Sequence, residues 1–150
     1  MTIAPSRVLP VKWTQWVSIV KFDHQNTPKK TGVYELRYAS KGKAIPLARV
    51  FGTDQRGLLY VGSTHRRTLR KRLKEFKEAV AENRHARCTA RKTYWDYKFY
   101  DAFPCEKLEL RYAPCKDAEG EETKILQEYL MKFKDKPPMN FTFSRRLVGK

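Results

Sequence analysis

The sequence has no hydrophobic run long enough to cross a membrane, and residues 1–12 lack the apolar segment of a secretory signal peptide. It also lacks internal repeats and low-complexity segments. These absences argue against a membrane-embedded, secreted or repeat protein. We therefore expect a cytoplasmic protein, and its length of 150 residues fits a single domain over residues 1–150.

Cysteine is scarce, with three residues at positions 88, 105 and 115. An odd number without a Cys-x-x-Cys pair argues for reduced thiols and against a disulfide framework. His85 and the three cysteines could together supply four zinc ligands. However, Cys105 and Cys115 lack the close spacing of ligand pairs in tetrahedral zinc sites. We therefore interpret the cysteines as small buried thiols.

Acidic residues are few relative to basic ones, 16 against 32, which gives a net charge of +16. Such an excess predicts a polyanionic partner, because neutralising phosphates releases condensed counterions and so drives binding. Hydrophobic residues make up 41% of the chain and aromatic residues 13%, so we expect the chain to fold. Charge alone also fits a ribosomal or chromatin-type binder without catalytic chemistry.

The spacing of apolar residues predicts the secondary structure. Trp13, Trp16, Val17 and Val20 recur at helical spacing, so we expect a helix in an N-terminal extension over residues 1–30. Short apolar runs and alternating patterns predict strands at Gly32 to about Ala39, Leu58 to Val61, Trp95 to Phe99, and Leu108 to Tyr112.

Two longer stretches carry an apolar stripe at helical spacing. They predict one helix from about Thr64 or Thr68 to Asn83 and another from about Ala118 to Lys134, which a Pro-Pro pair ends. Together the elements predict an α/β fold of the α+β type. We expect a small, mainly antiparallel central sheet flanked by helices.

Two short strings lie on the first two predicted strands, Gly32-Val33-Tyr34 and Tyr60-Val61-Gly62. In the helix that follows, Arg72 lies beside the apolar stripe, where it can reach the sheet. Glu128 lies in the last helix, and Asn140 follows the Pro-Pro pair. In this order the motifs resemble those of the GIY-YIG nuclease superfamily. The resemblance covers a nuclease core over residues 31–143.

The resemblance implies a metal-dependent endonuclease and a role for each motif residue. Tyr34 would be the general base, and Tyr60 would orient the attacking water or a phosphate oxygen. Arg72 would hold the scissile phosphate. Glu128 would be the sole protein carboxylate on a Mg²⁺ or Mn²⁺ ion, and Asn140 would support the site.

This chemistry is also coherent without the resemblance. Mg²⁺ keeps several waters, so one carboxylate and the substrate phosphate can hold it. A guanidinium binds two phosphate oxygens at once and offsets the charge that grows in the transition state. A tyrosine hydroxyl has an ordinary pKa of about 10, so a nearby cation would have to lower it before it could accept a proton from water.

The sequence departs from the family pattern in three places. The stretch between the two tyrosine motifs is long and carries several basic residues, which resembles members that are restriction enzymes. Phe76 stands one turn after Arg72, where many members have a histidine or tyrosine, so His65 or His85 could substitute. The helical wheel places Glu122 closer than Glu128 to the apolar stripe of the last helix, so Glu122 competes as the metal ligand. We prefer Glu128, because its distance to Pro137 and Asn140 matches the family pattern.

Positive charge is concentrated around the first long helix, and an excess of lysine and arginine there favours a surface that faces phosphates. We expect the protein to bind double-stranded DNA through Lys43, Arg66, Arg67, Arg70, Lys71, Lys74, Arg84, Arg87 and Arg91. A palindromic target would favour a homodimer. Two alternatives stay open: a catalytically silent nucleic-acid-binding module of the same fold, and a nuclease directed by DNA or RNA structure.

Overall fold

The computed structural model describes residues 10–140, which form a mixed α/β fold with a mainly antiparallel sheet, as the sequence predicts. The main sheet contains β1 (Val17–Ser18), β2 (Gly32–Ser40), β3 (Lys43–Ala44), β6 (Leu58–Ser63) and β7 (Leu108–Pro114). A separate two-stranded hairpin contains β4 (Leu47–Ala48) and β5 (Thr53–Asp54). The helices are α1 (Leu69–Glu82), α2 (Thr89–Arg91), α3 (Phe99–Ala102) and α4 (Ala118–Phe133).

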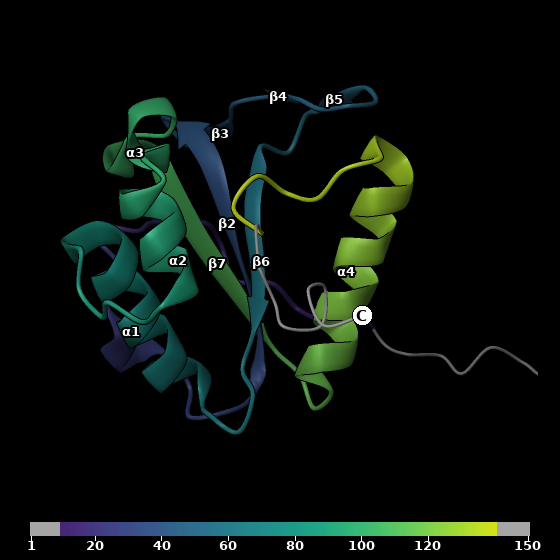
Figure 1. The fold of residues 1–150 in the computed structure, drawn as a ribbon. Coiled ribbons are helices and arrows are strands. Elements are labelled where there is room, and N and C mark those ends of the chain that lie inside the picture. The colour runs from purple at the N-terminus through teal and green to yellow at the C-terminus, as the bar shows by residue number, and fades with distance from the viewer. Residues whose placement is uncertain (1–9, 141–150) are drawn as a thin grey trace, which may run out of the picture.

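The helices cover the sheet from two sides. In Figure 1, α1, α2 and α3 lie on one side of β2, β6 and β7, and α4 lies on the other. Strand β2 pairs with both β6 and β7, and its first five residues are buried. Tyr34 on this strand lies opposite Gly62 of β6 and Tyr112 of β7. The register therefore places the two tyrosine motifs side by side.

Helix α1 begins and ends close to where the sequence predicts. The Thr68 hydroxyl caps the first turn by accepting a hydrogen bond from the Lys71 amide, and Asn83 ends the helix in the left-handed conformation. Leu69, Leu73 and Phe76 are fully buried on the face that meets the sheet. Because Arg72 is adjacent to this stripe, the helix carries the arginine to the edge of the core.

The predicted N-terminal helix is wrong. Residues 11–16 have no regular secondary structure, and β1 pairs with the outer side of β7. The helically spaced tryptophans pack on an arginine instead: the Arg111 guanidinium lies 4.3 Å from the Trp13 ring and 4.5 Å from the Trp16 ring. Backbone pairing with β7 and these cation–π contacts hold the segment in place without a helical turn.

The predicted strand from Trp95 to Phe99 is also wrong. Residues 89–102 form α2, a π-helical turn (Lys92–Asp96) and α3. The Tyr94 hydroxyl donates to the Phe103 carbonyl at 2.8 Å, and the Trp95 indole donates to the Ala79 carbonyl at 3.1 Å. The aromatic residues thus cover the end of α1. The alternation of aromatic and polar residues from Trp95 to Phe99 therefore lies on short helical turns and not on a strand.

None of the helices between residues 10 and 140 combines the length and apolar character that a bilayer crossing requires. The three cysteines are free thiols and half-buried.

Candidate active site

Three of the predicted site residues meet at the point where α1 crosses the paired strands β2 and β6. The Arg72 Nε donates a hydrogen bond to the Tyr34 hydroxyl at 2.9 Å. The Tyr34 and Tyr60 rings lie 6.0 Å apart, centroid to centroid. The structure therefore brings the two motif tyrosines and the helix arginine together, although they are up to 38 residues apart in sequence.

Phe76 fixes both tyrosines from the α1 side. Its ring centroid lies 5.1 Å from that of Tyr34, edge to face, and 5.4 Å from that of Tyr60, nearly parallel. Such aromatic pairs stabilise one geometry beyond simple burial. The helix position that could have carried a histidine or tyrosine is therefore filled by a hydrocarbon ring that cannot transfer a proton.

The two tyrosines differ in exposure. Tyr34 is fully buried and Tyr60 half-buried. Burial raises the pKa of Tyr34 well above its ordinary value, and the Arg72 charge only partly opposes this effect. Burial also raises the pKa of Tyr60, while the Arg72 charge and a hydrogen bond from Tyr34 lower it. Arg72 is therefore bonded to Tyr34, the Tyr34 ring lies beside that of Tyr60, and the Tyr34 side chain has no contact with solvent.

Glu122 joins this cluster from the first half of α4. Its carboxylate accepts a hydrogen bond from the Ser63 hydroxyl, at the end of β6. Burial raises the pKa of Glu122, and the Ser63 hydrogen bond and the Arg72 charge oppose the rise. Because Glu122 interacts electrostatically with both Arg72 and Tyr60, it is the α4 carboxylate that belongs to the site.

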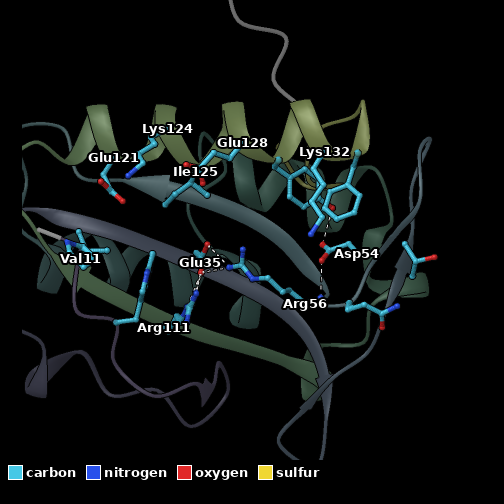
Figure 2. A pocket seen from close by; sticks show the side chains of 16 residues that line it. Val11, Glu35, Asp54, Arg56, Arg111, Glu121, Lys124, Ile125, Glu128 and Lys132 are labelled. Atoms are coloured by element: carbon cyan, nitrogen blue, oxygen red, sulfur yellow. Dashed lines mark hydrogen bonds and ion pairs between the residues drawn. The ribbon is translucent and has the colours of Figure 1, made fainter. Parts of the chain in front are cut away.

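Glu128 is not at this site, and the sequence-based preference for it over Glu122 is corrected by the geometry. Glu128 is exposed and lines a separate pocket of about 550 Å³, together with Glu35 and Arg111 (Figure 2). Six helical residues separate the two glutamates, which corresponds to about 9 Å along the axis and about 120° around it. The two carboxylates therefore cannot serve one site.

Asn140 supports the open edge of β6. Its side-chain oxygen accepts from the Val61 amide and its side-chain nitrogen donates to the Val61 carbonyl, both at 2.9 Å. The Met139 amide donates to the Leu59 carbonyl at 2.8 Å. Asn140 therefore makes the two hydrogen bonds to Val61 that a neighbouring strand would make. These bonds hold the segment that carries Tyr60 and Gly62.

Gly62 leaves room for the buried tyrosine. A Cβ atom at this position would lie 2.4 Å from Tyr34 Cζ and 2.5 Å from its hydroxyl oxygen. Because Tyr34 is fully buried, its ring can move only by displacing Phe76 or Arg72. The packing of Tyr34 in the first motif thus requires a glycine at position 62 in the second motif.

We expect Gly62→Ala to lower the free energy of unfolding by about 1–3 kcal/mol, the usual cost of overpacking a core. Urea unfolding of the purified variant measures this loss. In a Tyr34→Leu background, the same substitution should cost clearly less, because the clashing ring atoms are absent. Equal costs in both backgrounds would show that the clash with Tyr34 is not the cause.

An open pocket of about 640 Å³ lies in front of this cluster. Its lining residues include Ser63, His65, Arg67, Arg72, Glu75, His85, Arg87 and Cys88. Arg67 pairs with Glu75, which also lies 3.8 Å from Arg72. Sequence reasoning missed Ser63, Glu75 and Cys88 as neighbours of the site, because their proximity depends on how the loops fold around α1.

The residues predicted to bind DNA have several environments. Arg67 and Arg87 are exposed and line the pocket. Arg66 lies beside it in the left-handed conformation, while Lys43, Lys71 and Lys74 are exposed elsewhere. Three others are already engaged within the protein: Arg70 with the Thr27 carbonyl, Arg84 with Glu78, and Arg91 with Asn83 and Asp96.

No group of three or more histidine, cysteine, aspartate or glutamate residues within residues 10–140 could hold a metal ion. A divalent ion at this site would therefore need oxygen ligands from a substrate and water in addition to Glu122. A single half-buried carboxylate with a raised pKa fits this type of site, because a nearby cation would favour its charged form.

Comparison of the chain with models of protein families, with curated proteins and with solved structures finds no match.

Proposed function

We propose that this protein is a divalent-metal-dependent endonuclease that hydrolyses DNA phosphodiester bonds, in line with its resemblance to GIY-YIG nucleases. One observation carries the proposal: the buried hydroxyl of Tyr34 holds the Nε of Arg72, whose side chain lines an open pocket. One of the remaining guanidinium nitrogens lies 3.8 Å from Glu75, and a phosphate would compete with this carboxylate for the guanidinium.

The charge around the pocket favours a phosphate substrate. Arg67, Arg72 and Arg87 line it, and the chain as a whole carries a net charge of +16. Positive groups in a cleft attract a polyanion and offset the charge that develops on a phosphate during substitution. We propose double-stranded DNA as the substrate.

Glu122 is the residue that would hold a Mg²⁺ or Mn²⁺ ion in this proposal. When bound, such an ion supplies charge stabilisation for the phosphate and the leaving oxygen. Ser63 orients the carboxylate from β6, and Arg72 holds the phosphate from α1. Asn140 and Gly62 act as positioning residues, because they fix the strand that carries Tyr60.

We also propose that the protein is a restriction-type enzyme and that two copies act together on a palindromic site. A cytoplasmic location is part of the same proposal. The long insertion between β2 and β6 supports the restriction assignment, because it builds the hairpin of β4 and β5 onto the nuclease core. Figure 1 shows this hairpin beyond the ends of β2 and β6, near the C-terminal end of α4.

Incubation of the purified protein with supercoiled plasmid tests the proposal. With Mg²⁺ or Mn²⁺ we expect discrete linear fragments, and with a chelator we expect none. Plasmid that is retarded but intact under every condition would identify a silent binding module instead. Preferential cutting of branched DNA or of RNA, without discrete plasmid fragments, would identify a structure-directed nuclease.

A further inference from the structure

Two histidines line the pocket in front of Arg72, and their surroundings differ. His65 is exposed and pairs with Glu119 of α4. His85 comes from the loop after α1, and its Nε2 lies 3.6 Å from a carboxylate oxygen of Glu78. A carboxylate beside one imidazole nitrogen orients the ring, and Nδ1 is then the nitrogen that can accept a proton.

The loop that carries His85 is fixed at both ends. Arg84 binds Glu78 at 2.7 Å, and the Cys88 amide donates to the His85 carbonyl at 2.8 Å. His85 itself adopts the left-handed conformation, with a φ of 64°. Cys88, three residues later, acts electrostatically on Tyr60 and Arg72. The loop therefore closes one wall of the pocket beside the tyrosine and arginine cluster.

The tyrosines are poor candidates for the base in this protein. Burial raises the pKa of both Tyr34 and Tyr60, and Tyr34 has no exposed surface. Phe76 fills the helix position from which another acid–base group could act. An imidazole is the side chain best suited to take up a proton near neutral pH.

We infer that His85 is the general base of the proposed nuclease, with Glu78 as the residue that positions it. A water oxygen forms a bond to phosphorus while the water proton moves to His85 Nδ1. The bond between phosphorus and the leaving sugar oxygen breaks, its electron pair stays on that oxygen, and solvent supplies the proton. The inference rests on the proposed function, because it assigns a step within it.

Charged and titratable groups surround His85 on several elements. On its own loop these groups are Arg84, Arg87 and Cys88, and on α1 they are Arg72, Glu75 and Glu78. The loop before α1 adds His65 and Arg67. Because arginines do not titrate near neutral pH, the two histidines are the groups to separate by experiment.

The first test is His85→Asn, since asparagine tolerates the left-handed conformation but cannot accept the proton at neutral pH. Single-turnover cleavage of supercoiled plasmid should slow by about 100-fold to 10,000-fold, the usual contribution of a general base. Binding of a labelled DNA duplex should not change. His65→Asn, the matched control on the same pocket, should cut at close to the wild-type rate.

Chemical rescue and a pH profile separate this role from a structural one. His85→Gly keeps the left-handed backbone and opens space in an exposed part of the pocket, so added imidazole should restore part of the cleavage rate. The dependence of the cleavage rate on pH should differ between the wild type and His85→Asn, because the variant lacks the imidazole that takes up the proton.

Wild-type rates and an unchanged pH profile in His85→Asn would overturn the inference while leaving the nuclease proposal intact. Failure of imidazole to rescue His85→Gly, together with a lower unfolding temperature, would assign His85 a structural role. A wild-type protein that does not cut DNA with any divalent metal would overturn both proposals.

Discussion

Replacement of Glu122 by glutamine is expected to slow metal-dependent plasmid cleavage by about a hundredfold or more, while Glu128→Gln leaves the rate unchanged. Glu122 is half-buried and bonded to Ser63, and it lies close enough to Arg72 and Tyr60 for electrostatic interaction with both side chains. Glu128 is exposed and lines the pocket on the Glu35 side of the molecule. Glutamine keeps the size of the side chain and removes the charge that a metal ion requires.

Single-turnover cleavage of supercoiled plasmid, measured across a range of Mg²⁺ concentrations, is the appropriate assay. If Glu122 binds the ion, the defect should persist at high Mg²⁺ or be relieved only partly. DNA binding without metal should stay close to that of the wild type, because the carboxylate does not attract phosphate. The reverse pattern, with activity lost in Glu128→Gln and kept in Glu122→Gln, would place the metal in the other pocket.

The difference between these two glutamates shows what the sequence could and could not predict about the site. Tyr34, Tyr60 and Arg72 were predictable because two paired strands and one strongly amphipathic helix fix their relative positions. The preference for Glu128 came from its spacing to Asn140 in the family. The angular position of each residue around the helix favoured Glu122, and this position decides which side chains of α4 face Ser63.

The fold shows the same contrast. Strands β2 and β7 and helices α1 and α4 have long periodic patterns, and all four were predicted. The errors concern Trp13 to Val20 and Trp95 to Phe99, where a few aromatic residues set the pattern. Their positions depend on distant partners, the Arg111 guanidinium in one case and the last carbonyls of α1 in the other. A local pattern does not contain such partners.

The second large effect concerns stability and involves the sheet face opposite α1. Glu35 on β2 is 1% exposed and binds two arginines (Figure 2). Its carboxylate accepts from the Arg111 Nε at 2.7 Å and lies 3.1 Å from an Arg56 nitrogen. Arg111 is half-buried and held between Trp13 and Trp16, where burial lowers its pKa and Glu35 opposes the change.

We expect Glu35→Ala to lower the free energy of unfolding by about 3–5 kcal/mol, because it leaves the Arg111 charge partly buried without its partner. Urea unfolding followed by tryptophan fluorescence measures the loss, since Trp13 and Trp16 pack on the same arginine. Glu82→Ala is the control: it removes an exposed carboxylate that lies 3.7 Å from Arg84, and it should cost less than about 1 kcal/mol.

The double variant Glu35→Ala with Arg111→Met separates the lost ion pair from lost packing. If the unpaired charge causes the instability, removing Arg111 as well should recover part of the free energy, since methionine keeps contact with the tryptophans. Recovery would show that the unpaired Arg111 charge causes most of the instability of Glu35→Ala. If the two losses simply add, Glu35 acts through packing, and the charge argument for this sheet face is wrong.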